Sequence, residues 1–359
     1  MKITRLFTWQ EDLPLRRPYT VADHRVEGVT NWIVELYTDT GLIGYGAASP
    51  SDYVTGETPS ACAAALSRDN LAWLLGTDPR ELPLLCRQLN DRLACTPAAR
   101  AAVDMALHDL LSQHLGLPLV RMLGQVHERL LTSITIGIQP IDHTLEDADE
   151  YVGRGFQILK VKLGTHLDED IERLSKLRER VGPAIGIRVD PNQGYSRIEV
   201  EQFIAATTDL DIELLEQPMP AKDIRAMQQL PSAVRRCLVA DESLLDARDA
   251  LQLLTPTPAC GIFNIKLMKC GGIHPAQRIA TLAETAGIDL MWGCMDESII
   301  SISAALHTAL SSPATTYLDL DGSFDLARDV VSGGFILENG YLRVTDQLGL
   351  GVQRLMSET

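Results

Sequence analysis

The sequence lacks the features of proteins that bind nucleic acid or span a membrane. Lys and Arg together number 32 against 48 Asp and Glu, so the 359-residue chain carries a formal net charge of −16. This excess of negative charge argues against nucleic acid and anionic membranes as partners. No apolar run approaches the ~18 residues of a membrane-spanning helix, and the first residues lack the apolar core of a secretory signal.

Cysteine is also scarce, and its spacing excludes two kinds of site. No two cysteines form a Cys-x-x-Cys pair, and their number is odd. The pattern therefore predicts reduced thiols in a cytoplasmic protein, without a disulfide framework or a paired-cysteine zinc site. The seven are Cys62, Cys86, Cys95, Cys237, Cys260, Cys270 and Cys294.

The N-terminal third predicts a mixed α+β unit. Residues 32–37 and 42–46 read as the strands of a hairpin around an Asp-Thr-Gly turn at 39–41. Residues 98–115 repeat apolar side chains at helical spacing, and Gly116-Leu117-Pro118 ends that helix. We expect residues 1–125 to form this unit.

The middle of the chain alternates short apolar runs with helical stretches, such as 168–181 and 275–286. This alternation is typical of successive βα units. It predicts an α/β fold: a parallel (β/α) barrel over residues 126–322, with residues 323–359 returning to the N-terminal unit. The expected strands are 132–138, 158–163, 185–190, 212–216, 237–241, 262–268, 290–295 and 316–321.

Two lysines stand two residues apart in the second expected strand. Residues i and i+2 of a strand point to the same face, so Lys160 and Lys162 project together. Mutual repulsion favours the neutral amine, and a lysine with a lowered pKa can act as a base. Taken alone, the pattern fits an exposed edge strand better.

Carboxylates close the next three strands. Asp190, Glu216 and Asp241 each stand at the carboxyl end of an expected strand, where barrel active sites form. Clustered like charges require a cation, and oxygen ligands suit Mg²⁺ or Mn²⁺. A single Asp at such a point is explained by helix capping, but three in consecutive units are not.

A third lysine, Lys266, lies in the sixth expected strand. The second and sixth strands of an eight-stranded barrel are opposite, so Lys162 and Lys266 should face each other across the carboxylates. Two bases on opposite sides of a substrate are what a two-base proton transfer requires. For Lys266 alone, a lysine extending to the barrel rim is a sufficient explanation.

These motifs resemble the enolase superfamily, in its muconate-lactonizing-enzyme-like subgroup, over essentially the full chain. The matching residues are Lys160, Lys162, Asp190, Glu216, Asp241 and Lys266, the last within Asn-Ile-Lys-Leu-Met-Lys-Cys-Gly-Gly at 264–272. The resemblance implies a lysine base and a metal-stabilised enediolate. It also implies a modified (β/α) barrel at 126–322 and an α+β capping domain at 1–125 that closes over it, with residues 323–359 returning to this domain. Residues 19–28 and 51–57 are the expected capping loops.

The eighth expected strand carries Asp319 and Asp321, which is similar to the dipeptide epimerases. In those enzymes the pair holds the α-ammonium of the substrate, and two carboxylates on one face suit a cation. Asp-Gly turn chemistry accounts for Asp321 but not for Asp319. Thr135 in the first strand is a further candidate for substrate contact. The expected partner is thus a dipeptide, and a homo-oligomer is compatible with the sequence.

Specificity depends on the end of the seventh strand. Asp296 beside an apolar substrate would be desolvated without a partner, so it suggests a cationic dipeptide with Lys or Arg. Alternatively, Asp296 caps the following helix. A competing specificity is Ala-Glu, for which Arg25 would hold the glutamate. A muconate cycloisomerase, an o-succinylbenzoate synthase and a metal-binding barrel without catalysis also remain open.

Overall fold

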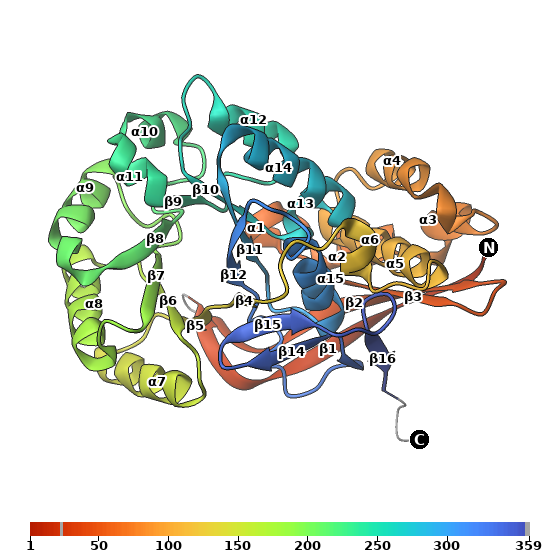
Figure 1. Cartoon of the computed structure of the whole chain (residues 1–359), viewed down its shortest axis with the longest axis horizontal. Helices are drawn as coiled ribbons and strands as arrows, with labels where there is room; N and C mark the ends of the chain where they lie inside the picture. The colour runs from red at the N-terminus through yellow and green to blue at the C-terminus, as the bar shows by residue number, and fades with distance from the viewer. Residues whose placement is uncertain (22–23, 356–359) are drawn as a thin grey trace.

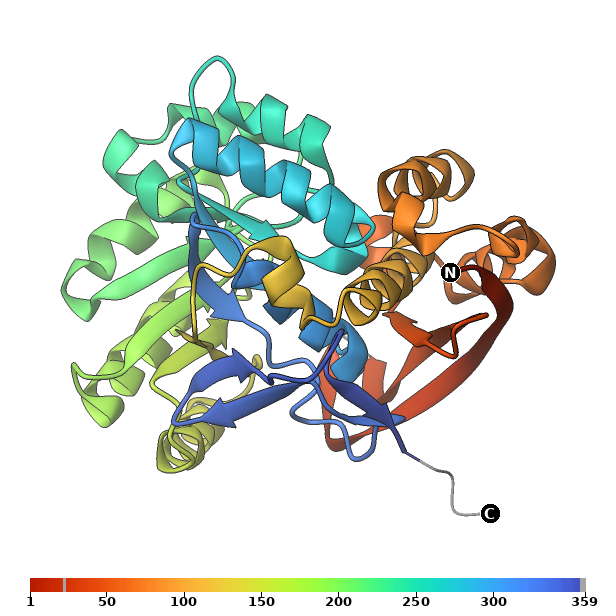
Figure 2. The same ribbon diagram turned by 45° about the vertical axis from the view of Figure 1, so that its right-hand side comes forward.

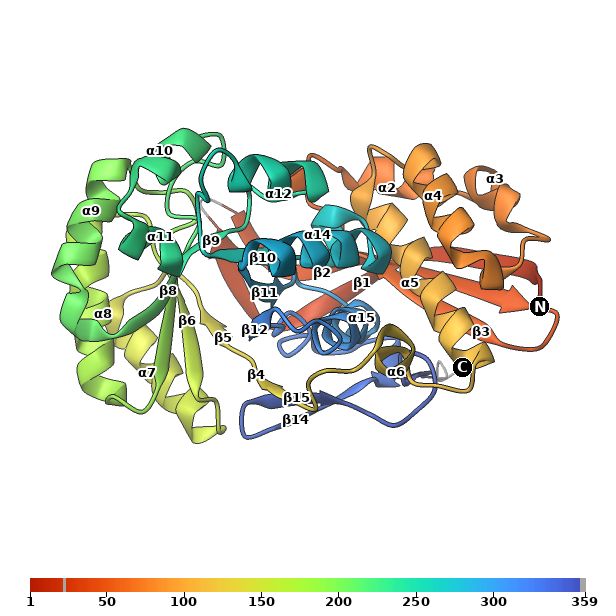
Figure 3. The same cartoon turned by 45° about the horizontal axis from the view of Figure 1, so that its top comes forward.

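The computed structural model describes residues 1–21 and 24–355, and the side chains of residues 18–26 lie outside that description. A ring of βα units stands beside a smaller unit of strands and helices (Figure 1). Views turned about two axes show the same arrangement, with the long N-terminal strands passing from one part to the other (Figures 2 and 3). Within the described residues, no helix combines the length and apolar character needed to cross a membrane.

The smaller unit is built on a three-stranded antiparallel sheet in the order β1-β2-β3. Its strands are β1 (Ile3–Val21), β2 (His24–Thr38) and β3 (Ile43–Ala48). Its helices are α1 (Asp52–Thr55), α2 (Pro59–Ala65), α3 (Arg68–Leu71), η1 (Ala72–Leu74), η2 (Pro79–Glu81), α4 (Leu82–Arg92), α5 (Pro97–His114) and α6 (Leu119–Leu123). The predicted hairpin and the predicted helix at 98–115 are confirmed as β2–β3 and α5.

Helix α5 packs closely on strand β3, and two glycines make this approach feasible. A Cβ on Gly44 would collide with the carbonyl oxygen of Ala106, and one on Gly46 with that of Ala102. Asp109 on the same helix accepts hydrogen bonds from Tyr45 N at 2.9 Å and from Leu350 N at 2.8 Å. One buried carboxylate thus joins the N-terminal sheet to the end of the chain.

In the described part of the chain, eight parallel strands follow one another around the barrel in sequence order. The ring closes where Ser133 N donates to Leu318 O at 3.1 Å, beside a bridge between Thr132 and Leu318. The strands are β5 (Ile134–Ile136), β6 (Ile158–Lys162), β7 (Gly186–Asp190), β8 (Ile212–Glu216), β9 (Leu238–Ala240), β10 (Ile262–Ile265), β11 (Asp289–Gly293) and β12 (Thr315–Asp319). The predicted barrel is confirmed.

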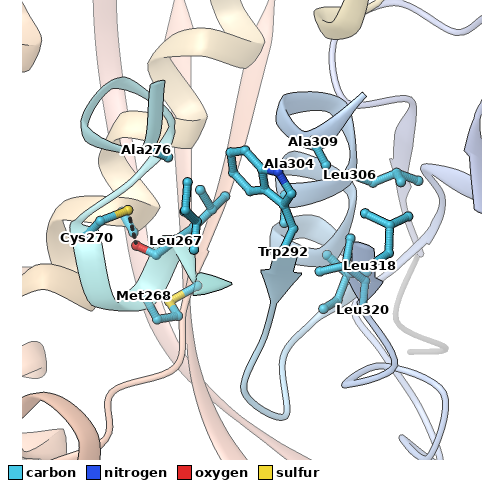
Figure 4. Close-up of a cluster of buried hydrophobic side chains, with 14 of the residues drawn as sticks. Leu267, Met268, Cys270, Ala276, Trp292, Ala304, Leu306, Ala309, Leu318 and Leu320 are labelled. Carbon is cyan, nitrogen blue, oxygen red and sulfur yellow. Dashed lines mark hydrogen bonds between the residues drawn. The ribbon is translucent and has the colours of Figure 1, made fainter. Parts of the chain in front are cut away.

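Helices surround the strands and bury the main apolar core against their outer faces (Figures 1 and 3). Figure 4 shows part of this core, in which Trp292 of β11 lies between Leu267 and the α15 residues Ala304 and Leu306. The helices are α7 (Ile141–Gly153), α8 (Leu167–Val181), α9 (Arg197–Ala206), η3 (Thr208–Leu210), α10 (Ile224–Gln229), α11 (Ser232–Cys237), α12 (Ala247–Leu254), α13 (Leu267–Cys270), α14 (Ile273–Ala286) and α15 (Ile299–Ala309).

Inside the barrel, an apolar layer underlies a charged one. Leu214, Val239, Ile262 and Met291 form a separate buried cluster, with Tyr317 packed against it. Each of the four strands that carry this cluster continues toward its carboxyl end, where the polar side chains stand. The apolar layer thus lies toward the amino ends of these strands, and the charged groups lie at the mouth of the barrel, at their carboxyl ends.

The last part of the chain returns to the smaller unit. Strand β13 (Val331–Gly333) pairs with β16 (Val352–Arg354), and β14 (Phe335–Glu338) pairs with β15 (Tyr341–Val344), which also pairs with β4 (Leu130–Leu131). Arg354 Nη1 lies 2.7 Å from Glu35 Oε1 on β2. The long β1 also reaches the barrel, where Arg17 forms an ion pair with Glu150 on α7.

The structure corrects two local predictions. The strand expected over 262–268 ends at Ile265, and Leu267–Cys270 forms the short helix α13 instead. Gly271 and Gly272, with φ of 91° and 116°, permit the reversal that follows. In the segment expected as a capping loop at 19–28, the described residues 19–21 and 24–28 instead belong to β1 and β2, because both strands continue far beyond the sheet they share with β3.

Candidate active site

Strand β6 places both of its lysines inside the barrel. Lys160 is 2 % exposed, and Lys162, at the strand end, is partly exposed. Lys160 Nζ lies 2.7 Å from Glu216 Oε2, 2.7 Å from Asp319 Oδ2 and 3.2 Å from Asp190 Oδ2. This ammonium is therefore the centre of the charged layer.

The expectation that repulsion between the two lysines lowers the pKa of at least one of them is not met at Lys160. Burial lowers the pKa of Lys160, but the carboxylates of Asp319, Glu216 and Asp190 outweigh it and raise this pKa well above its usual value. Three carboxylates in contact exceed the repulsion from one neighbouring lysine. Lys160 is thus held as a cation.

The three carboxylates predicted as metal ligands stand at adjacent strand ends and are almost completely buried. Lys162 Nζ lies 2.6 Å from Asp190 Oδ2, and Lys266 Nζ lies 2.8 Å from Asp241 Oδ2. In the described part of the chain, these three carboxylates do not place three oxygen atoms, one from each residue, all within 4.8 Å of one another. The ammonium of Lys160, in contact with both Asp190 and Glu216, lies between these two carboxylates.

Glu216 is the least satisfied of these carboxylates. Its Oε1 accepts a hydrogen bond from Asn264 Nδ2 at 2.8 Å, whereas its Oε2 has no aligned hydrogen-bond donor although Lys160 Nζ is close. Burial and the neighbouring Asp190 raise the pKa of Glu216 to about 7. Glu216 Oε2 is thus a buried oxygen that accepts no aligned hydrogen bond, and the three carboxylates offer only oxygen atoms as ligands. Both features fit Mg²⁺.

Lys266 lies on the opposite side of the barrel from Lys162. Strand β10 is four positions from β6 in either direction around the closed ring. Lys266 is 7 % exposed and directly follows β10. Burial lowers the pKa of Lys266, but the contact with Asp241 outweighs it and raises this pKa. The structure therefore places the two lysines on opposing strands, as predicted.

Two further residues in the charged layer were not predicted. Lys269, on α13, contacts both Asp241 and the carbonyl oxygen of Asn264. Ser133 Oγ donates a 2.7 Å hydrogen bond to Asp319 Oδ1. The spacing Lys266-x-x-Lys269 was visible in the sequence as a signal for the first, whereas no sequence signal distinguishes Ser133.

The two aspartates at the end of β12 have different surroundings. Asp319 is 5 % exposed and bonds to Lys160 and Ser133, whereas Asp321 is partly exposed. Asp321 Oδ2 accepts a 2.7 Å hydrogen bond from the backbone N of Thr135. Burial and the adjacent Asp319 raise the pKa of Asp321 to about 7. Thr135 is therefore near the site, and its backbone makes this contact.

Asp296 does not cap the following helix, so that alternative is wrong. The N-cap of α15 is Ser298, whose side chain accepts from Ile300 N, and Asp329 Oδ2 accepts from Ile299 N. The backbone oxygen of Asp296 accepts from Ser49 Oγ at 3.0 Å and from Asn31 Nδ2 at 3.4 Å. The smaller unit thus fixes the loop that carries Asp296 at the barrel mouth.

Of the two segments expected to cap the mouth, one is defined in full. Residues 51–57 form α1 with its flanks; Tyr53 on this helix is 76 % exposed, and Glu57 is buried. Glu57 accepts hydrogen bonds from Ala98 N at 2.6 Å and Ala99 N at 3.2 Å. Arg25 belongs to the other segment, and its side chain lies outside the described residues.

Opposed lysines around buried carboxylates, at the mouth of a barrel that carries a capping unit, define an enzyme of the enolase superfamily type. The chain belongs to the mandelate racemase/muconate lactonizing enzyme family. Residues 3–124 match the model of its N-terminal domain, and residues 143–356 match the enolase C-terminal domain-like model.

One relative and two solved structures illustrate this membership. The L-Lys-D/L-Arg epimerase of Methylococcus capsulatus is 58% identical over 352 residues, which are 98% of this chain and 99% of that protein. A crystal structure of the Methylococcus capsulatus dipeptide epimerase with Mg and L-Arg-D-Lys has a TM-score of 0.97 and 58% identity over 98% of this chain and 99% of that one. A substrate-liganded complex of the L-Ala-D/L-Glu epimerase of Bacillus subtilis has a TM-score of 0.92 and 34% identity, covering 98% and 99%.

Proposed function

We propose that this protein is a Mg²⁺-dependent isomerase that epimerises the C-terminal residue of a dipeptide, with a preference for cationic dipeptides. The observation that carries the proposal is the opposition of Lys162 and Lys266 across a layer of buried carboxylates. A binding protein needs no base on each side of its ligand, so the arrangement argues against a metal-binding barrel without catalysis.

The lysines carry the proton transfer in this proposal. Lys162 removes the α-proton of the C-terminal residue on one face, and Lys266 delivers a proton on the other. The roles are exchanged for the opposite stereoisomer. Lys160, which is held as a cation, is positioned to stabilise negative charge that develops on the substrate carboxylate in the enediolate.

The metal ligands in the proposal are Asp190, Glu216 and Asp241. All three offer buried carboxylate oxygens, and Glu216 Oε2 lacks an aligned hydrogen-bond donor. When bound, Mg²⁺ or Mn²⁺ would supply positive charge beside the substrate carboxylate. The Methylococcus capsulatus relative was crystallised with Mg, which supports this assignment.

Specificity is assigned to the carboxylates around the mouth. Asp321, with Asp319 beneath it, would bind the α-ammonium of the dipeptide, with Thr135 beside it. Asp296 would meet a Lys or Arg side chain. Identity to the L-Lys-D/L-Arg epimerase is 58%, against 34% for the L-Ala-D/L-Glu epimerase, which supports a cationic substrate over Ala-Glu. It also supports an epimerase over a cycloisomerase or an o-succinylbenzoate synthase.

The proposal divides the chain into a capping domain at 1–125, the barrel at 126–322 and a C-terminal return at 323–359. Contacts of the last segment with both other parts, such as the Arg354–Glu35 ion pair, support this division. The scattered, unpaired cysteines favour a cytoplasmic location.

Deuterium exchange against a dipeptide library tests the proposed reaction. The protein is incubated in D₂O with Mg²⁺ and the library, and mass spectrometry identifies members that gain one deuterium. We expect exchange at the C-terminal residue, strongest for dipeptides that contain Lys or Arg. Absence of exchange in every member would refute the epimerase assignment.

The specificity assignment needs a separate comparison. Asp296→Ala should reduce kcat/KM for Lys- and Arg-containing dipeptides far more than for Ala-Ala. Asp91→Ala, at an exposed carboxylate outside the mouth, is the matched control. If Ala-Glu is a better substrate than every cationic dipeptide, or if Asp296→Ala keeps the cationic preference, the assignment is wrong and Arg25 is the residue to test.

A further inference from the structure

Lys269 is a buried charged residue that the proposed reaction does not use. It lies on α13, one turn beyond Lys266, and is 3 % exposed. Burying an ammonium is costly unless it is paired and hydrogen-bonded. The contacts of Lys269 therefore indicate what the residue does.

The ammonium of Lys269 bonds to three oxygens. Its Nζ lies 2.6 Å from the backbone oxygen of Asp241 and 3.0 Å from that of Asn264. It also forms an ion pair with Asp241 Oδ1. A lysine ammonium has three N–H donors, so three acceptors satisfy it completely. A residue bonded in this way is fixed and is not arranged to exchange protons with a substrate.

The contacts divide the two oxygens of Asp241 between two lysines. Lys269 bonds to Oδ1, and Lys266 bonds to Oδ2 at 2.8 Å. Because Lys269 also holds the backbone oxygen of Asp241, it fixes both ends of that residue. The carboxylate is thus prevented from rotating about its side-chain bonds, and Oδ2 remains on the side of Lys266.

The turn that carries Lys269 is itself anchored from the smaller unit. Arg100 on α5 donates to Cys270 O at 2.9 Å, and Ser49 N donates to Met268 Sδ at 3.3 Å. Gly271 lies against the Arg100 guanidinium so closely that a Cβ there would collide with it. Lys269 is therefore held by its own contacts and by the residues on both sides of it.

We propose that Lys269 is a positioning residue that orients Asp241 for metal binding, so that Oδ2 is the oxygen offered to Mg²⁺. The inference rests on the proposed function, because it takes Asp241 as a metal ligand. The proposed role of Lys269 is to orient Asp241. The orientation and the positive charge of Lys269 have opposite effects on Mg²⁺ binding. Removing a positive charge near the site favours cation binding by itself, whereas releasing Asp241 weakens it.

Lys269→Met separates the two effects. Mg²⁺ binding is measured by isothermal titration calorimetry without substrate, and epimerisation is followed in parallel. We expect the variant to bind Mg²⁺ about tenfold or more weakly, the range for losing a group that orients a metal ligand. Lys269→Arg, which keeps the charge and several donors, should recover part of the affinity. When Lys269→Met is saturated with Mg²⁺, its kcat should be closer to the wild-type value than its affinity for Mg²⁺ is.

The matched control is Lys176→Met, which removes an exposed lysine on the surrounding helix α8. Circular dichroism checks folding, and Lys269→Ala, which has a smaller side chain without N–H donors, replaces the Met variant if that variant does not fold. Unchanged or tighter Mg²⁺ binding by the folded Met or Ala variant would overturn the inference. Failure of the wild-type protein to bind Mg²⁺ would instead overturn the proposed function.

Discussion

Lys160 and Asp319 form an ion pair of 2.7 Å between two strands that are separated by β5. The pair gives the two aspartates of β12 different roles. Asp319 is occupied by Lys160 and Ser133, whereas Asp321 is partly exposed at the mouth. In the proposed reaction, Asp321 would therefore be the residue that first meets the substrate ammonium, and Asp319 would mainly fix Lys160.

The first prediction concerns Asp321→Asn. The variant should lose about 2 kcal/mol of interaction with the ammonium of a free dipeptide, which corresponds to about 30-fold in kcat/KM. N-acetyl dipeptides lack the ammonium, so their already low rates should be unchanged. Asp319→Asn should slow both substrate types, because it acts through Lys160. Equal turnover of free and acetylated dipeptides by the wild type would contradict an ammonium site.

The second prediction separates the two bases. Lys162→Ala should still exchange the α-proton of one C-terminal stereoisomer through Lys266, but it should not epimerise. Lys266→Ala should show the opposite stereochemical preference. Exchange is followed by NMR in D₂O with each pure stereoisomer. Normal epimerisation by either variant would rule out the two-base scheme.

The third prediction is metal dependence. Exhaustive chelation should abolish epimerisation, and Mg²⁺ or Mn²⁺ should restore it, because both suit oxygen ligands. Glu216→Gln should raise the Mg²⁺ concentration needed for half-maximal activity, since it replaces a buried ligand oxygen with a donor. Full activity in the presence of chelator would show that Asp190, Glu216 and Asp241 have another role.

The fourth prediction concerns stability and pH, and it depends on His307. This ring accepts a hydrogen bond from Val120 N at 2.9 Å, and burial lowers the pKa of His307 to about 4. In the unfolded chain a histidine has a pKa of about 6.5. Between these values the unfolded state binds more protons, so the free energy of unfolding falls as pH decreases from 6.5 to 4. Over this pH range, His307 lowers the free energy of unfolding by up to about 3 kcal/mol.

His307→Asn provides the comparison, because the side-chain oxygen of Asn can accept from Val120 N and does not titrate. Urea unfolding of both proteins at pH 7.5 and pH 5 measures the difference in acid sensitivity. Comparing the two proteins cancels other titrating groups, such as Glu297, whose pKa burial raises to about 7. An identical pH dependence of the two proteins would exclude His307 as a source of acid sensitivity.

Most of the barrel could be predicted because its signals are local and repeated. Strand β8 was predicted at its observed bounds, and β6 and β7 within one residue, because apolar runs end at charged residues there. The lysines and carboxylates of the mouth could be located because the barrel topology brings strand ends together. These inferences required only the order of elements along the chain.

Features that depend on distant contacts could not be predicted in the same way. Residues 267 and 268 were predicted to end an apolar strand, but α13 forms there because Arg100 and two glycines fix the turn. The raised pKa of Lys160 results from carboxylates on three other strands, which a local lysine pair does not reveal. Likewise, the cap of α15 depends on Asp329, about thirty residues further along the chain.

The return of the chain end to the N-terminal unit has a consequence for synthesis. Leu119 N bonds to Gly349 O at 2.8 Å, and Asp109 accepts from Leu350 N, so α5 and α6 depend on residues that are made after the whole barrel. Domains usually fold in order as they leave the ribosome. Here these contacts of the first third of the chain form only after residues 349 and 350 are made, whereas the barrel strands between them can pair earlier.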